Sequence, residues 1–172
     1  VYRAGVDVKL GHEATPDSIA ELAPDALVIA TGSTSVIRQL PGMDTPGALP
    51  LYTLHELYAN EIDIPQGATV IVYDETGAQR AGHAAVALSK LGAQVKLVTP
   101  LLHPAESEGV TNLISLYELL FQHHVELVPH TRIVGVGPKT AFTRNAYSYE
   151  DGTLEGIDLA IWIEPLSAQD QL

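Results

Sequence analysis

The segment Asp74–Gly82 joins an apolar run to a helix-like stretch, and its glycines have a spacing that could bind a phosphate group. Counted back from Gly82, the glycine positions of the pattern G-x-G-x-x-G fall on Gly77, Gln79 and Gly82. In such a loop the first glycine makes a tight turn, the second lets the backbone approach a pyrophosphate, and the third lets helix and strand pack closely. The amides at the start of the following helix then bind the anion. Gly77 and Gly82 are therefore candidate residues for binding a nucleotide cofactor.

Other features of the same loop oppose this binding. Gln79 places a side chain where the pyrophosphate needs space, and Asp74 and Glu75 bring negative charge to the loop. Arg80 and the helix amides offset part of that charge. The second apolar run ends at Leu97–Pro100, without the acid that holds the ribose of NAD or an arginine for the extra phosphate of NADP. We therefore expect NAD(P) binding here to be weak or absent, and the alternative to a working site is a domain that packs well without a dinucleotide.

A second turn of small residues follows another apolar run. Residues Ala26–Ala30 are apolar without interruption, which predicts a strand buried on both faces. The run breaks at Thr31, Gly32 and Ser33, and Leu40–Pro50 then contains the Pro-Gly pairs of a linker. One interpretation is an ordinary buried strand that ends in a tight turn. The other rests on a resemblance: a strand that ends in Ala-Thr-Gly and is followed by a Pro-Gly linker resembles the junction in two-dinucleotide-domain flavoproteins, where small residues let the backbone pass close to the flavin nucleotide.

Predicted strands and helices alternate through the centre of the chain, and they must position these turns. We predict a helix at Thr53–Asn60, and then strands at Thr69–Tyr73, Gln94–Val98 and Val125–Pro129 with helices at Ala81–Leu91 and Asn112–His123 between them. Nearer the N-terminus we predict a strand at Gly5–Leu10 and a helix at Asp17–Leu22 with Thr15 as its N-cap. Strands that alternate with helices indicate a parallel sheet.

From Thr131 onward the hydrophobic period changes to two. This pattern predicts short strands at Arg132–Val136, Thr140–Thr143, Ala146–Tyr149 and Leu159–Ile163. The predicted fold class is therefore α/β: a Rossmann-like parallel sheet flanked by helices, with an antiparallel β meander as an appendage.

Composition narrows the classes of function. The 172 residues carry a net charge of −12, which repels phosphate backbones and anionic lipid, so we expect no nucleic-acid and no membrane partner. The absence of cysteine excludes thiolate zinc and iron–sulfur ligands from this segment, and the histidines show no ligand-like spacing, so we predict no metal site. No Ser-His-Asp or Cys-His arrangement has the context of a known motif, so we predict no catalytic residue. The chain has no initiator Met and no signal-like start, which we interpret as a piece of a larger cytoplasmic protein.

Two stretches together resemble a known family. They are GVDVKLGHEATPDSIAELAPDALVIATGS (5–33) and TVIVYDETGAQRAGHAAVALSKLGAQVKLVTP (69–100). They resemble the C-terminal nucleotide-binding-type region of trimethylamine dehydrogenase and 2,4-dienoyl-CoA reductase-like flavoproteins, which are old yellow enzyme relatives with appended FAD- and NAD(P)-type domains. The D-x-x-G form of the loop, from Asp74 to Gly77, and the VTP ending look more like the amine dehydrogenase side, where the inserted domain has drifted from NAD(P) binding.

The resemblance implies a domain organisation and a set of partners. Residues 1–45 would be the tail of a FAD-type domain, residues 46–160 an inserted NAD(P)-type Rossmann-like domain, and residues 161–172 the return toward the FAD-type domain. In the parent protein FAD or ADP would lie against Thr31, Gly32 and Ser33, whereas FMN and a 4Fe-4S cluster would lie outside this segment. The expected partners are the N-terminal barrel and the first half of the FAD-type domain of the same parent chain, and a homo-oligomer is compatible with this arrangement.

The function that the resemblance implies is that of a non-catalytic C-terminal fragment of a flavin-dependent oxidoreductase. The parent would be of the amine dehydrogenase or enoyl reductase type, similar to NADH:flavin oxidoreductases, and the fragment alone would bind no cofactor and have no activity. The alternative is a cofactor-free Rossmann-like module that serves interdomain or subunit packing.

Overall fold

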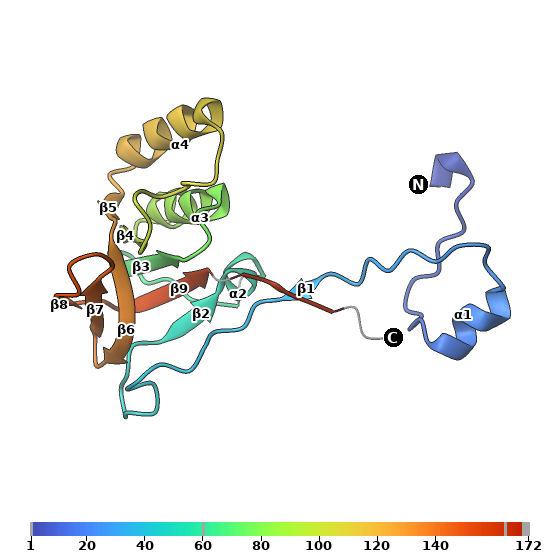
Figure 1. Ribbon diagram of the computed structural model, residues 1–172, viewed down its shortest axis with the longest axis horizontal. Helices are drawn as coiled ribbons and strands as arrows, with labels where there is room; N and C mark the ends of the chain where they lie inside the picture. The colour runs from blue at the N-terminus through green and yellow to red at the C-terminus, as the bar shows by residue number, and fades with distance from the viewer. Residues whose placement is uncertain (1, 60, 164, 170–172) are drawn as a thin grey trace. The chain divides into compact units, whose positions relative to one another are not determined.

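The computed structural model describes residues 2–59, 61–163 and 165–169, and the chain divides into two compact units. The larger unit, Ser35–Ser167, contains most of the regular structure (Figure 1). Its elements are β2 (Leu51–Thr53), α2 (Leu54–Tyr58), β3 (Thr69–Asp74), α3 (Gln79–Lys90), β4 (Gln94–Val98), α4 (Val110–Gln122), β5 (Glu126–Val128), β6 (Thr131–Gly137), β7 (Thr140–Asn145), β8 (Asp151–Glu155) and β9 (Leu159–Ile163).

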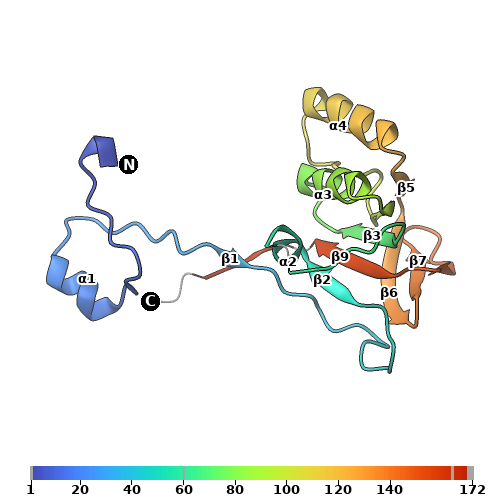
Figure 2. The same cartoon turned by 180° about the vertical axis from the view of Figure 1, so that it is seen from behind.

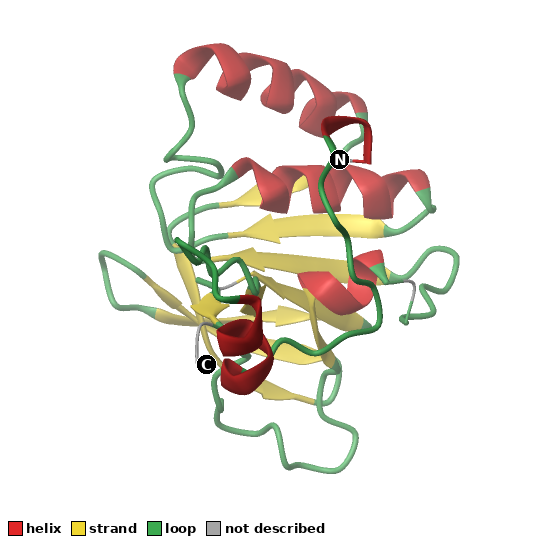
Figure 3. Ribbon diagram, turned by 90° about the vertical axis from the view of Figure 1, so that its right-hand side faces the viewer, coloured by secondary structure: helices red, strands yellow, loops and turns green. Residues whose placement is uncertain are grey.

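A parallel sheet forms the centre of the larger unit (Figure 3). Its strand order is β2-β9-β3-β4-β5. The central strand β3 is buried from Val70 to Asp74, and all five residues of β9 are buried as well. Strands that are covered on both faces read as continuous apolar runs, which is why both segments lack polar alternation.

Helices cover one face of this sheet. Figures 1 and 2 agree that α3 and α4 lie along the same side of it. The contact face of α3 consists largely of small residues, since Ala81, Ala84 and Ala85 are buried against a core that includes Val70 and Val72. Small side chains let the helix axis approach the sheet closely, and the helix positions the glycine loop that precedes it.

An antiparallel sheet of order β6-β7-β8 covers the opposite face. The core on this side joins Ile71 and Tyr73 of β3 to Trp162 of β9 and to Ile133 and Val136 of β6. Tyr73 and Trp162 are directly paired across the two strands, and their ring centroids lie 4.3 Å apart. The predicted fold class, a Rossmann-like parallel sheet with helices and an antiparallel β appendage, is confirmed.

The segment predicted as a linker packs onto the larger unit. Leu40 and Leu49 are buried in the core on the side of the antiparallel sheet. The Leu49 amide donates to the Gly137 carbonyl at 3.0 Å, and the Val136 amide donates to the Pro41 carbonyl at 2.9 Å. Residues 40–50 therefore form a strap along β6, although their Pro and Gly content resembles that of a loose connection.

Some predicted strands lie elsewhere in the structure. Leu159–Ile163 is not part of the meander but forms β9, between β2 and β3 in the parallel sheet. The third meander strand is Asp151–Glu155, because Ala146–Tyr149 forms a turn around the Asn145 side chain. The short strand β2 was not predicted, and Asn60, the predicted end of the helix at α2, lies outside the described residues.

The smaller unit consists of Val1–Thr34 and Ala168–Leu172 and has little regular structure within its described residues. It contains η1 (Tyr2–Ala4) and α1 (Pro16–Leu22), while β1 (Ser33–Thr34) pairs with β10 (Ser167–Ala168). The predicted N-cap of α1 is confirmed, because Thr15 Oγ1 accepts from the Ser18 amide at 3.2 Å.

The strands predicted at Gly5–Leu10 and Ala26–Ala30 are absent. Leu27, Val28 and Ile29 are 52%, 85% and 46% exposed, so the apolar run lies in extended chain without a sheet. A strand forms only where another strand accepts its hydrogen bonds, and none is placed beside this run among the described residues.

Candidate functional site

The glycine loop begins where β3 ends. Side chains of the loop itself accept hydrogen bonds from several of its backbone amides. Asp74 is buried, and its Oδ1 accepts from the Thr76 amide at 2.8 Å and from the Thr76 hydroxyl at 2.7 Å. The Thr76 hydroxyl oxygen in turn accepts from the Ala78 amide at 3.3 Å. Burial raises the pKa of the Asp74 carboxyl, while the hydrogen bonds from Thr76 act in the opposite direction. Two loop amides that could face a pyrophosphate are thus engaged within the loop.

Gly77 has a structural reason to be glycine. Its φ of +67° lies in the left-handed region, which glycine adopts without strain. A Cβ added there would lie 3.0 Å from Leu101 Cδ1 and 3.2 Å from Ser107 Oγ. The segment between β4 and α4 therefore crosses directly over the loop, in the space that a ligand of an intact glycine loop would approach.

Gly82 is buried where α3 meets α4. A Cβ added at Gly82 would lie 2.8 Å from both Cδ1 and Cδ2 of Leu116, so this glycine permits contact between the two helices. The assignment of Gly77 and Gly82 as cofactor-binding residues stays a prediction, and the packing gives each of them another role. With the loop amides engaged and the loop covered, the residues present do not fit the pyrophosphate of a dinucleotide.

Glu75 is the centre of an ionic cluster at the same end of β3. Its Oε1 accepts from the Tyr73 hydroxyl at 2.8 Å, from Arg38 at 2.9 Å and from Arg132 at 3.1 Å. Arg38 also lies over the ring of Trp162, 5.8 Å from its centroid. Burial raises the pKa of the Tyr73 hydroxyl, and the neighbouring Glu75 charge adds to that shift. The Glu75 carboxylate was expected from the sequence to oppose phosphate binding. Arginines from distant segments of the chain neutralise its charge.

This cluster lies at the carboxyl ends of β3 and β9, which are neighbours in the parallel sheet. Ligands of open α/β sheets bind in the crevice outside the carboxyl ends of the strands. Here the Glu75 amide donates to the Ile163 carbonyl at 3.2 Å, which joins the carboxyl ends of the two strands. This cluster could not be predicted from local residue spacing, because Arg38 and Arg132 are 37 and 57 residues away from Glu75 along the chain.

The turn Thr31–Ser33 belongs to the smaller unit. Gly32 has a φ of +80° with nothing within 4 Å of an added Cβ. The Thr31 hydroxyl donates to the Gln169 carbonyl, and the Gln169 amide donates to the Gly32 carbonyl at 3.0 Å. The structure thus brings the three predicted residues beside the C-terminal segment 167–169, whereas Gly77 and Gly82 belong to the other unit.

A mostly apolar hollow of about 620 Å³ adjoins this turn. Its lining residues come from the start of α1, from the exposed apolar run and from the C-terminal segment: Glu13, Ala14, Ile19, Leu27, Val28, Ile29, Ala30, Thr31, Ala168 and Gln169. The assignment of Thr31, Gly32 and Ser33 as cofactor-binding residues stays a prediction. The exposed backbone of the turn is compatible with it.

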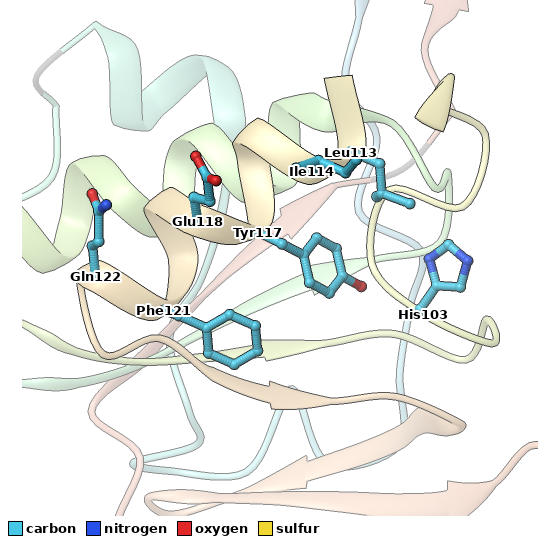
Figure 4. Close-up of a pocket in the computed structure, with 7 residues that line it drawn as sticks. All are labelled: His103, Leu113, Ile114, Tyr117, Glu118, Phe121 and Gln122. Carbon is cyan, nitrogen blue, oxygen red and sulfur yellow. The ribbon is translucent and has the colours of Figure 1, made fainter. Parts of the chain in front are cut away.

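A larger apolar groove of about 880 Å³ runs along α4. Figure 4 shows the rings of Tyr117 and Phe121 on the same side of the helix, with His103 beyond the Tyr117 hydroxyl. The other lining residues are Leu113, Ile114, Glu118 and Gln122. Leu116 and Leu120 of the same helix are buried, whereas the Phe121 side chain is 62% exposed.

The described residues contain no group of three or more His, Cys, Asp or Glu side chains arranged to hold a metal ion. Within the same residues, none of the helices has both the length and the apolar character needed to cross a bilayer.

The architecture is an α/β domain with a parallel sheet, covering helices and an antiparallel appendage, and its glycine loop is filled by its own side chains. No family model matches the chain. Among curated proteins it is similar to bilirubin reductase from Mediterraneibacter gnavus, with 24% identity over 93% of this chain and 24% of that protein. It is also similar to N,N-dimethylglycine/sarcosine dehydrogenase from Chromohalobacter salexigens, with 29% identity over 72% of this chain and 18% of that protein.

Solved structures share the fold over nearly the whole chain. A 6-hydroxypseudooxynicotine amine oxidase from Pseudomonas geniculata N1 matches with a TM-score of 0.82 and 22% identity, over 99% of this chain and 27% of that one. Histamine dehydrogenase from Rhizobium sp. 4-9 matches with a TM-score of 0.79 and 19% identity, over 94% and 24% of the two chains. A 2-naphthoyl-CoA reductase matches with a TM-score of 0.79 and 22% identity, over 98% and 24%.

The predicted resemblance to amine dehydrogenase and CoA reductase proteins is thus confirmed at the level of the fold. The chain spans about a quarter or less of the length of the proteins that it matches. All of these proteins are named as dehydrogenases, reductases or oxidases, so the chain is similar to one part of several oxidoreductases.

Proposed function

We propose that this chain is a non-catalytic C-terminal part of a flavin-dependent oxidoreductase of the amine dehydrogenase or enoyl reductase type. One observation carries the proposal: the whole chain, 99% of it, superposes on 27% of an amine oxidase with a TM-score of 0.82. Sequence similarity to a reductase over 93% of the chain points to the same class. The chemistry would take place elsewhere in the parent, because a bound flavin supplies the hydride or electron transfer in such enzymes.

Within the parent, the chain would supply support for a nucleotide. Thr31, Gly32 and Ser33 would let the backbone lie against FAD or ADP, since their side chains are small and Gly32 leaves open space around its Cα. FMN and a 4Fe-4S cluster would be bound outside this segment, which contains no cysteine. The smaller unit, Val1–Thr34 with Ala168–Leu172, would belong to the FAD-type domain, and the larger unit, Ser35–Ser167, would form the inserted domain.

The same proposal assigns partners to the exposed apolar run. Leu27, Val28 and Ile29 would be covered by the first half of the FAD-type domain, where the run would become a strand of a complete sheet. The N-terminal barrel of the parent would be the second partner, in a homo-oligomer or a monomer. The net charge of −12 disfavours nucleic acid and anionic membranes, and we propose a cytoplasmic location.

A cofactor-free packing module is the second candidate function. The filled glycine loop and the exposed groove on α4 favour it, because both suit a domain that presents surfaces rather than binding a nucleotide. The parent's visible absorption spectrum separates the two candidates. Flavin bands support the first, while a colourless parent leaves the second.

The first test of the nucleotide site uses Gly32→Glu in the parent protein, which adds bulk and negative charge to the turn. We expect the bound adenine nucleotide, released by denaturation and quantified by chromatography, to fall by about tenfold or more. Gly47→Glu is the matched control, because Gly47 also has a positive φ of +76° and nothing within 4 Å of an added Cβ. Equal nucleotide content in the two variants would contradict the assignment of the turn as a nucleotide site. That result would be independent of whether the parent shows flavin absorption bands.

A further inference from the structure

The N-terminus of α3 is the place where a dinucleotide-binding domain of this architecture holds an anion. The N-cap residue, Ala78, has no side chain that could accept a hydrogen bond from the helix. The Gln79 amide, the first of the helix, instead donates to Oε1 of Glu108 at 3.1 Å. Glu108 is 29 residues further along the chain and precedes α4.

The segment that carries Glu108 is anchored over the glycine loop. The Ser107 amide donates to the Gly77 carbonyl at 3.0 Å, and the Ser107 hydroxyl donates to the same carbonyl. The Glu108 amide donates to the carbonyl of Ala105, which is buried, at 3.0 Å. The Tyr117 hydroxyl of α4 donates to the Pro104 carbonyl at 3.2 Å. These contacts hold in place the backbone that leads to Glu108.

We propose that Glu108 is a built-in anion that takes the place of a pyrophosphate at α3. Its carboxylate accepts from the helix amide and interacts favourably with the positive end of the helix dipole, as a phosphate oxygen would. Asp74 occupies a second part of the loop, because its Oδ1 accepts from the amide and hydroxyl of Thr76. The larger unit therefore keeps the architecture of a dinucleotide site, with amides of the loop and of the helix N-terminus bound by its own side chains.

This inference concerns the larger unit alone and does not depend on whether the parent binds a flavin. It assigns the segment between β4 and α4 as a permanent cover of the glycine loop. It also explains the tolerance of Gln79 at the second glycine position, since no ligand needs the space that its side chain takes.

The test is a calorimetric titration of residues 1–172 with inorganic pyrophosphate, which probes the anion site without a nucleoside. We expect no detectable binding by the unchanged chain in the millimolar range, and an affinity about tenfold higher or more in Glu108→Ala. Glu106→Ala is the matched control: it removes one acid from the same segment, where Glu106 accepts from the Leu102 amide at 3.1 Å, and should leave the affinity unchanged. Any general effect of the chain's negative charge is equal in the two variants.

Two results would overturn the proposal. One is binding of pyrophosphate by the unchanged chain as tight as by Glu108→Ala, and the other is an equal gain in Glu106→Ala. If Glu108→Ala fails to fold, Glu108→Gln retains an acceptor for the Gln79 amide and removes only the charge. We expect that variant to bind pyrophosphate about threefold more tightly or better, and no gain there would equally overturn the proposal.

Discussion

At the scale of single residues, the acids of the glycine loop act as internal ligands. The residue types alone show Asp74 and Glu75 as charges that oppose a phosphate. The structure shows that Glu75 is neutralised by Arg38 and Arg132, while Asp74 is buried and organises the loop through Thr76. The opposition to phosphate could be predicted from the sequence because it follows from charge. The partners could not be predicted, because they come from segments that only the tertiary fold brings together.

The burial of Asp74 predicts a dependence of stability on pH. Since burial raises its folded pKa above the ordinary value of 3.8, the folded state takes up a proton more readily than the unfolded state. The contribution of Asp74 to the free energy of unfolding is then fully present below pH 3.8, and it is lost as the pH rises through the folded pKa. Asp74→Asn cannot ionise, so its free energy of unfolding relative to the unchanged chain should rise between pH 4 and pH 7, as urea denaturation at each pH would measure. A difference that stays constant across this range would contradict the burial effect.

At the scale of elements, local sequence signals predicted where many helices and strands begin and end. The order of the strands in the sheets depends on pairing between distant segments, which those signals do not contain. The limits of β4 were predicted as Gln94–Val98, and the Thr15 cap of α1 was predicted because both signals are local. The position of β9 was not predicted, since a run of five apolar residues does not specify which strands it joins. Ala26–Ala30 has the pattern of a strand, but none of the described residues forms a strand beside it, and pattern alone does not form a sheet.

The contact between α3 and α4 gives a prediction at this scale. Gly82→Val inserts a branched side chain where even a Cβ would lie 2.8 Å from Leu116, so we expect the free energy of unfolding to fall by about 1–3 kcal/mol. Leu116→Ala should restore part of that loss in the double variant, although alone it leaves a cavity in the buried core. A double-mutant cycle by urea denaturation measures the coupling. Strictly additive effects would show that the two helices do not meet at this glycine.

At the scale of the whole molecule, the two units differ in how completely they are folded. The larger unit has a core on both faces of its sheet, whereas the smaller unit exposes the apolar run Leu27–Ile29. Exposed contiguous apolar surface indicates a site of interaction. Under the proposed function, other parts of a parent protein would cover this run.

Val28→Asp tests that explanation in both contexts. Val28 is 85% exposed, so in residues 1–172 alone the substitution should change the free energy of unfolding by less than about 0.5 kcal/mol. In the parent, where the run would be a strand covered on both faces, an unpaired buried carboxylate would be strongly destabilising, and the protein should lose bound flavin or fail to fold. Val110→Asp, at the 71% exposed start of α4, is the control and should be neutral in both proteins, because an acid suits the first turn of a helix. Flavin absorbance per mole of parent and urea denaturation of the chain give the two readings. A parent that carries Val28→Asp with full flavin content would show that the run stays uncovered.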